Sequence, residues 1–133
     1  MCGMNAIRSP MAESIARKHL PSNVLVRSAG VHTGTRDPFV DAVIGEAGLP
    51  LPGHDPRSLE DVEDDLVDLI ITLSDAAHER ALELARSAAV EVEHWPTPDP
   101  STGEGSREHR LLAYRQVRDD LERRIIERFG LDR

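Results

Sequence analysis

The stretch LIITL at residues 69–73 is a continuous run of apolar and β-branched side chains, and it decides the fold class. Such a run is typical of a strand buried on both faces, as in a parallel sheet. A helix is predicted directly after it, over residues 75–88, and a further strand over residues 90–95. Strand, helix and strand in that order indicate a parallel βαβ unit with helices on both faces of the sheet.

The rest of the chain continues this alternation of strands and helices. The further elements expected are a helix from Pro10 up to Pro21, a strand at residues 24–26, a helix capped by Asp37 and ended by Gly48, a loop over residues 49–57, a short acidic helix opening at residues 58–61, a loop over residues 95–106, and a long helix over residues 107–129. The expected fold is therefore α/β, a three-layer α/β/α sandwich with a short parallel sheet and a site at the carboxyl ends of its strands.

Composition narrows the class of protein. The 133 residues suit one domain, over residues 1–133, and the net charge of −8 argues against a general nucleic-acid or anionic-membrane partner. Cys2 is the one cysteine, so an internal disulfide and a cysteine-type zinc site are excluded. No apolar run reaches the length of a membrane span and no secretory signal is visible, so a cytoplasmic location is expected.

The chemistry is concentrated in the stretch CGMNAIRSP at residues 2–10. A loop in front of a helix start directs several backbone N–H groups at one point, and the helix dipole adds positive charge there. The Arg8 guanidinium has the planar shape that matches two oxygens of a phosphate. Cys2 facing these donors is expected to be a thiolate, with Ser9 donating to its sulfur. The stretch thus predicts a site that binds a tetrahedral dianion and presents a nucleophile to its central atom.

This stretch resembles the phosphate-binding loop of the low-molecular-weight protein-tyrosine-phosphatase family, in which a cysteine is followed by five residues, an arginine and a serine. The continuation through residues 9–13 and the sequence SAG at residues 28–30 extend the match. Residues 71–75, Trp95 and the pair at residues 99–100 are most similar to the arsenate-reductase branch of the same superfamily. The resemblance covers the whole chain.

The resemblance implies a mechanism without a metal or other cofactor. Cys2 attacks phosphorus and forms a cysteinyl-phosphate, Asp99 protonates the leaving oxygen, and the same carboxylate then activates water. Arg8 and the loop amides stabilise the equatorial oxygens. The implied phosphate-binding residues are those of the loop: Gly3, Met4, Asn5, Ala6, Ile7, Arg8 and Ser9.

Three features depart from the family pattern. The hydrophobic strand that precedes the cysteine in the family is absent, because this chain starts at Met1, so the sheet is expected to lack its first central strand. Aromatic residues make up only 3% of the chain, so selectivity for a phosphotyrosine ring is weakly supported. Ser74 stands where a relay cysteine of thioredoxin-coupled arsenate reductases is expected, so an internal disulfide cascade is excluded.

Three functions follow as hypotheses. The leading one is a cysteine-dependent hydrolase of phosphate monoesters, of the protein-tyrosine-phosphatase type, acting on a phosphorylated protein or a small phosphomonoester. The second is arsenate reduction with an external thiol, in which arsenate replaces phosphate as the oxyanion. The third is a non-enzymatic, catalytically degenerate remnant that binds an anion or forms a homodimer. The six histidines show no spacing typical of metal ligands, so a metal site is not expected.

Overall fold

The computed structural model describes residues 2–4, 8–21, 23–32, 37–49, 67–86 and 90–130, without the side chains of residues 2–4, 9 and 31–32. The elements, in chain order, are β1 Cys2–Met4, α1 Arg8–His19, β2 Gly30–His32, α2 Pro38–Glu46, β3 Leu69–Thr72, α4 Asp75–Ala85, β4 Glu91–His94, the 3₁₀ turn η1 Pro100–Thr102 and α5 Arg107–Phe129. Residues 50–57 of the expected loop and the short helix expected at residues 58–61 lie outside the described residues. In the described part of the chain, no helix is both long and apolar enough to cross a membrane.

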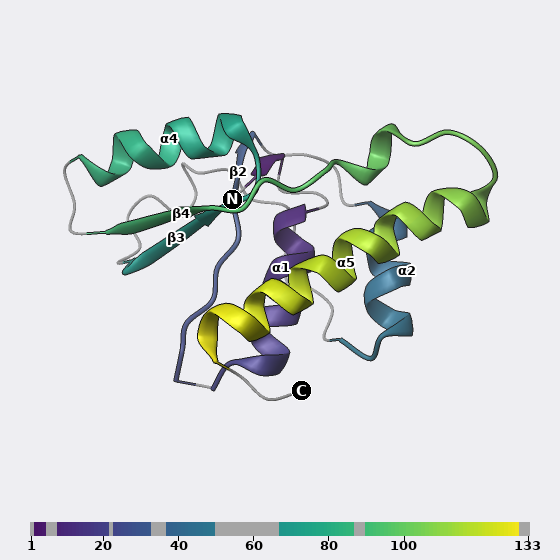
Figure 1. Ribbon diagram of the computed structural model, residues 1–133, viewed down its shortest axis with the longest axis horizontal. Helices are drawn as coiled ribbons and strands as arrows, with labels where there is room; N and C mark the ends of the chain where they lie inside the picture. Colours follow the sequence, from purple (N-terminus) through teal and green to yellow (C-terminus); the bar gives the residue numbers. More distant parts are fainter. Residues whose placement is uncertain are drawn as a thin grey trace.

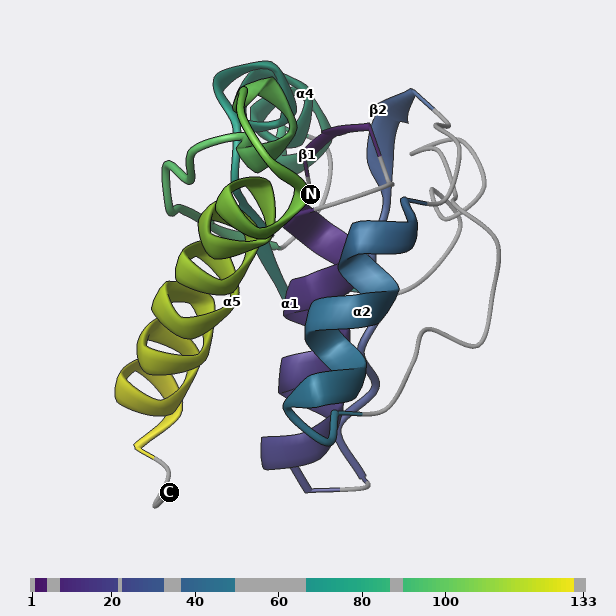
Figure 2. The ribbon, with the colours of Figure 1, turned by 90° about the vertical axis from the view of Figure 1, so that its right-hand side faces the viewer.

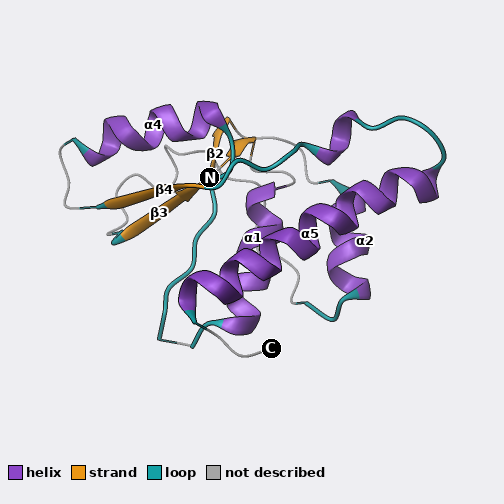
Figure 3. Cartoon of the chain, in the orientation of Figure 1, coloured by secondary structure: helices purple, strands orange, loops and turns teal. Residues whose placement is uncertain are grey.

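The strands lie between two layers of helices (Figures 1 and 2). β1 pairs with β2 and β3 pairs with β4, both in parallel, so the described strands form two two-stranded sheets. Helix α4 packs against all four strands on one side, and α1, α2 and α5 pack together on the other (Figure 3). The predicted α/β sandwich with short parallel pairing is confirmed.

The apolar core lies on the side of α1, α2 and α5, because these helices carry apolar stripes that face one another. The buried residues of α5 include a row at spacings of three and four, which is Leu111, Tyr114, Val117, Leu121 and Ile125, and Ile126 is buried beside it. Met11 and Ile15 of α1 and Ile44 of α2 complete the contact with them. Leu73, directly after β3, joins the same cluster and connects the strands to the helices.

Local capping chemistry sets the ends of the helices. Asp37 caps α2 as predicted, because its Oδ1 accepts a hydrogen bond from the Phe39 N–H at 2.8 Å. Helix α5 has the predicted bounds and ends at Gly130, whose φ of 64° is a left-handed conformation that glycine adopts without strain. Helix α1 begins at Arg8, slightly before the predicted start at Pro10.

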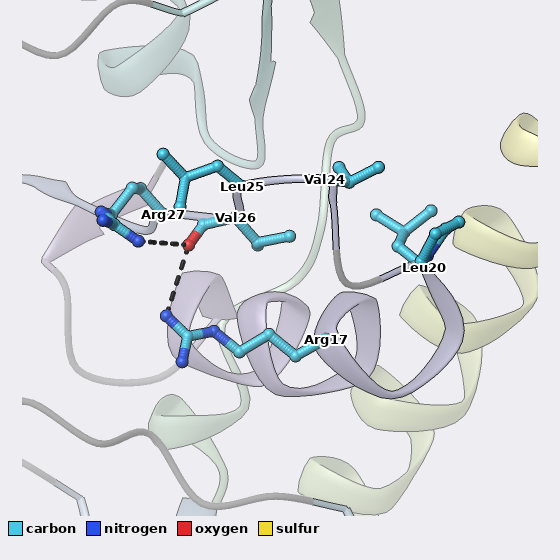
Figure 4. A pocket seen from close by; sticks show the side chains of 7 residues that line it. Arg17, Leu20, Val24, Leu25, Val26 and Arg27 are labelled. Atoms are coloured by element: carbon cyan, nitrogen blue, oxygen red, sulfur yellow. Dashed lines mark hydrogen bonds between the residues drawn. The ribbon is translucent and has the colours of Figure 1, made fainter.

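The strand predicted at residues 24–26 is wrong. These residues are not in a strand, Leu25 is 72% exposed, and β2 begins only at Gly30. The carbonyl groups of a strand accept hydrogen bonds from a neighbouring strand. The carbonyl of Val26 accepts instead from two side chains, Arg17 Nη2 at 3.3 Å and Arg27 Nη1 at 3.2 Å (Figure 4). Hydrophobic pattern alone could not show that the ladder starts later.

Candidate active site

Two pairs of parallel strands lie next to the predicted nucleophile and the predicted acid along the chain. Cys2 pairs with Gly30 in the β1–β2 ladder, and α1 starts shortly after β1, at Arg8. Thr72 pairs with His94 in the β3–β4 ladder, and the chain then runs on to Asp99. Asp99 thus follows the carboxyl end of β4, whereas Cys2 is the first residue of β1, and Arg8 is the site residue that follows the carboxyl end of β1.

Buried polar contacts fix α1 beside β2. Ser28, just before β2, donates from its hydroxyl to Oε1 of Glu13 on α1 at 2.9 Å, and both side chains are buried. Arg17 Nη2 lies 3.5 Å from the other oxygen of Glu13, so the carboxylate has a cationic partner. Because β2 also pairs with β1, these contacts fix the start of α1 relative to Cys2. Ser28, the serine of the SAG sequence, thus braces the start of β2 against α1.

Arg8 connects the start of α1 to the segment that follows β4. Its Nη1 donates to the Thr97 carbonyl at 2.8 Å, across 89 positions of sequence. Thr97 is itself held in place, because its N–H donates to the Leu73 carbonyl at 3.0 Å. A guanidinium has five N–H donors. The bond to the Thr97 carbonyl orients Arg8, and within the part of the chain that the structure describes it leaves other donors for an anion.

Asp99 lies on the segment that Arg8 contacts, and it caps η1. Its Oδ1 accepts from the Ser101 N–H at 2.9 Å and from the Ser101 hydroxyl at 2.6 Å. These two bonds fix the direction of the carboxyl group and engage one oxygen only. The structure thus brings Arg8 and the Asp99 segment together at the end of β4.

The other predicted site residues lie outside what the structure describes. This holds for Asn5, Ala6 and Ile7 entirely, and for the side chains of Cys2, Met4 and Ser9. The position of Gly3 is given by its place in β1. The ring of amides around an oxyanion, with sulfur beneath it, stays a prediction.

Sequence reasoning missed one polar cluster near this site, formed by Thr72, His78 and His94. No two histidines are spaced in the sequence as neighbours on one helix, so their spacing does not predict a cluster. The β3–β4 register brings Thr72 beside His94, and α4 adds His78. Only the pairing register could have indicated this cluster.

The described residues contain no group of three or more His, Cys, Asp or Glu side chains placed to hold a metal ion. A pocket of about 270 Å³ lies beside α1, and Arg17 and residues 20–21 and 24–27 line it (Figure 4). Its lining contains none of the predicted catalytic residues. This pocket is therefore distinct from the candidate site at Arg8 and Asp99.

Comparison with known proteins gives the family. The model of the low molecular weight phosphotyrosine protein phosphatase family matches residues 1–129. The chain belongs to this family. An arsenate reductase of Bacillus licheniformis is 33% identical over 129 residues, which cover 94% of this chain and 88% of that protein.

Solved structures of similar proteins carry both activities in their names. An arsenate reductase of Archaeoglobus fulgidus is 28% identical with a TM-score of 0.73, covering 97% of this chain and 95% of the other. The tyrosine phosphatase Wzb of Escherichia coli, in complex with sulphate, is 26% identical with a TM-score of 0.73, covering 97% and 94%. The family assignment and the fold predicted from the sequence are confirmed, and the family includes both phosphatases and arsenate reductases.

Proposed function

We propose that this protein is a cysteine-dependent hydrolase of phosphate monoesters. The observation that carries the proposal is the bond from Arg8 to the Thr97 carbonyl, since it joins the helix that follows the cysteine loop to the segment that bears Asp99. Nucleophile, oxyanion binder and acid must surround a single phosphate, and this bond holds two of the three elements together. The single cysteine agrees with a reaction that needs one thiol and no disulfide relay.

In the proposed reaction, the Cys2 thiolate attacks phosphorus and the bond to the leaving oxygen breaks. Protonated Asp99 gives its proton to that oxygen, so the alcohol leaves neutral. The Asp99 carboxylate then takes a proton from water, which attacks phosphorus and releases phosphate and the Cys2 thiolate. Arg8 and the loop amides, from Gly3 to Ser9, hold the equatorial oxygens throughout. A reduced thiol suits a reducing compartment, so we expect the protein to act in the cytoplasm.

The substrate class proposed is a phosphorylated protein or a small phosphomonoester. The test is turnover of p-nitrophenyl phosphate at mildly acidic pH by the wild type, Cys2→Ser and Asp99→Asn. Cys2→Ser is expected to lower kcat by at least about 10³-fold, because the nucleophile is lost. Asp99→Asn is expected to lower kcat by roughly 10²-fold or more, because the leaving group is no longer protonated. Asp120→Asn, an exposed change on α5, is the matched control and leaves kcat unchanged.

Turnover equal in Cys2→Ser and wild type would reject the cysteine mechanism. The names of the relatives favour a second function, the reduction of arsenate by an external thiol. There, arsenate gains two electrons while two thiols, Cys2 and one supplied in trans, are oxidised to a mixed disulfide. Arsenate-dependent consumption of glutathione, abolished by Cys2→Ser, is the result that would assign this function. An absence of consumption together with phosphatase turnover supports the hydrolase.

A further inference from the structure

A buried hydroxyl at the end of β3 has three partners. Thr72 has no exposed surface, and its Oγ1 lies 2.8 Å from Nδ1 of His94 and 3.2 Å from Nδ1 of His78. The Glu93 carbonyl is the third partner, at 3.3 Å. The two imidazole rings stack with centroids 4.3 Å apart and an interplanar angle of 21°. Beyond them, His94 Nε2 lies 3.1 Å from Oδ1 of Asp75, whose side chain is 96% exposed.

The number of hydrogen-bond donors in this cluster restricts the tautomers of the His78 and His94 rings. The Asp75 carboxylate only accepts hydrogen bonds, so Nε2 of His94 must carry a proton. In neutral His94, Nδ1 then has none and must accept the single proton of the Thr72 hydroxyl, whose oxygen lies 2.8 Å from this nitrogen and 3.3 Å from the other acceptor, the Glu93 carbonyl. That proton is no longer free for His78, so Nδ1 of His78 must itself be the donor to Oγ1. The two neutral rings are therefore expected in opposite tautomers.

The same cluster lies at the start of the segment that carries the proposed acid. The Thr72 carbonyl accepts from the Trp95 N–H at 2.7 Å, and the Leu73 carbonyl accepts from the Thr97 N–H at 3.0 Å. The Thr97 carbonyl then holds Arg8, and Asp99 follows. A side-chain bond between Thr72 and His94 thus fixes the two strands at the residue pair from which this segment departs.

We propose that Thr72 and His94 are positioning residues, which place the Thr97 carbonyl and Asp99 through a hydrogen-bonded chain from Asp75 to His78. The expected effect of these residues on turnover rests on the proposed phosphatase function. The expected tautomers of His78 and His94 do not depend on that function. Neither residue touches the substrate. Each acts through the segment of residues 95–99.

The first test is ¹⁵N NMR of histidine-labelled protein at alkaline pH. His78→Gln and His94→Gln assign the signals. In the wild type, His94 is expected to be protonated at Nε2 and His78 at Nδ1, although free imidazole side chains favour the Nε2 form. In Thr72→Val, the acceptor of the His78 proton is lost, and its ring is expected to change to the Nε2 form. Two Nε2 forms in the wild type, or no change in Thr72→Val, would overturn the proposed network.

The second test is the turnover of p-nitrophenyl phosphate by Thr72→Val, Thr72→Ser and His94→Gln. His109→Gln, a change at an exposed residue of α5, is the control. Thr72→Val keeps the size of the side chain and removes the hydroxyl. It is expected to lower kcat by on the order of 10-fold, with a smaller change in KM, because the acid is displaced. Thr72→Ser restores the hydroxyl and is expected to recover most of kcat. Thermal unfolding verifies that each variant is folded.

Equal kcat in Thr72→Val and wild type would overturn the positioning role, as would an equal loss in the valine and serine variants. A wild type without turnover rejects the proposed function instead. In that case the ¹⁵N resonance of the Arg8 guanidinium is the readout. A shift of that resonance in Thr72→Val that Thr72→Ser reverses supports positioning, and an unchanged resonance rejects it.

Discussion

At the scale of single residues, Tyr114 shows most clearly what burial does to a polar group. The side chain is 1% exposed, and its hydroxyl donates to Oδ2 of Asp37 at 2.7 Å. Asp37 uses its other oxygen to cap α2, so one carboxylate connects α2 to α5. The Phe39 ring meets the Tyr114 ring edge-on, with centroids 5.3 Å apart. A charge on the phenol would have to form inside this packed contact.

The pKa of Tyr114 is therefore raised above its ordinary value, chiefly by burial and then by the hydrogen bond to Asp37. In the unfolded chain the phenol loses its proton near pH ~10, while in the folded protein it keeps it. The contribution of this group to stability is thus fully present below about pH 10 and is lost as the pH rises beyond it. The chain has one tyrosine, so tyrosinate absorbance reports this residue alone.

We expect the absorbance of the folded protein to stay unchanged where urea-unfolded protein is half titrated. In Asp37→Asn, which removes the negative charge, tyrosinate is expected to form at a lower pH than in the folded wild type. Reversible titration of folded wild type near pH ~10 would contradict this account.

At the scale of elements, α5 has an apolar stripe toward α1 and α2. Leu121 is 1% exposed on this stripe, whereas Leu112 of the same helix is 50% exposed. Leu121→Ala is expected to lower the free energy of unfolding by about 2–5 kcal/mol, because it leaves a cavity in packed surroundings. Leu112→Ala, the matched control, changes it far less. Urea unfolding measures both, and equal losses would contradict the assigned faces of α5.

A second contact joins α2 to α5 through charge. Oε1 of Glu46 accepts from Arg115 Nε at 2.7 Å and from Arg118 Nη1 at 2.8 Å. The Arg118 guanidinium also donates to the Val43 carbonyl at 2.8 Å, at the end of the same helix. The pKa of Glu46 is held below its ordinary value, chiefly by the hydrogen bond from Arg115.

A lowered pKa means that Glu46 contributes stability above about pH 4.3, the ordinary value, and loses that contribution as the pH falls further. Glu46→Gln is expected to lower the urea midpoint at neutral pH, by much less than Leu121→Ala, since water and salt screen a half-exposed carboxylate. The difference in urea midpoint between Glu46→Gln and the wild type is expected to become smaller at acidic pH. Glu83→Gln is the control, because it breaks a pair within one helix. A difference that grows in acid would refute the assignment.

At the scale of the whole molecule, most of the apolar core lies on one side of the strands and α4 on the other. We propose that residues 1–133 nevertheless unfold as one domain, because Leu73 and Ile71 of the strand region pack into the helical core. Trp95, the one tryptophan, lies directly after β4, while circular dichroism reports mainly the helices. We expect the two signals to give the same urea midpoint. A separate earlier transition in Trp95 fluorescence would divide the chain into two units.

A feature of this protein was predictable from the sequence when the groups that form it lie close together along the chain. Asp37 was identified as a helix cap because a carboxylate before Pro38 bonds a backbone N–H close by in sequence. The strand expected at residues 24–26 failed, because strand formation requires a partner that no local pattern specifies. The cluster around Thr72 was not predicted at all, because its members come from β3, α4 and β4.

The sequence by itself determined the helices α1, α2, α4 and α5, the parallel character of the strands and the family, since spacing, capping and the CGMNAIRSP stretch are local chemistry. Only the tertiary structure decided that Arg8 bonds the Thr97 carbonyl, that Ser28 meets Glu13 and that two histidines share one hydroxyl. The physical reason is that a hydrogen bond between distant segments depends on strand register and helix packing. Both are set by the whole chain, whereas a helix cap is set within one turn.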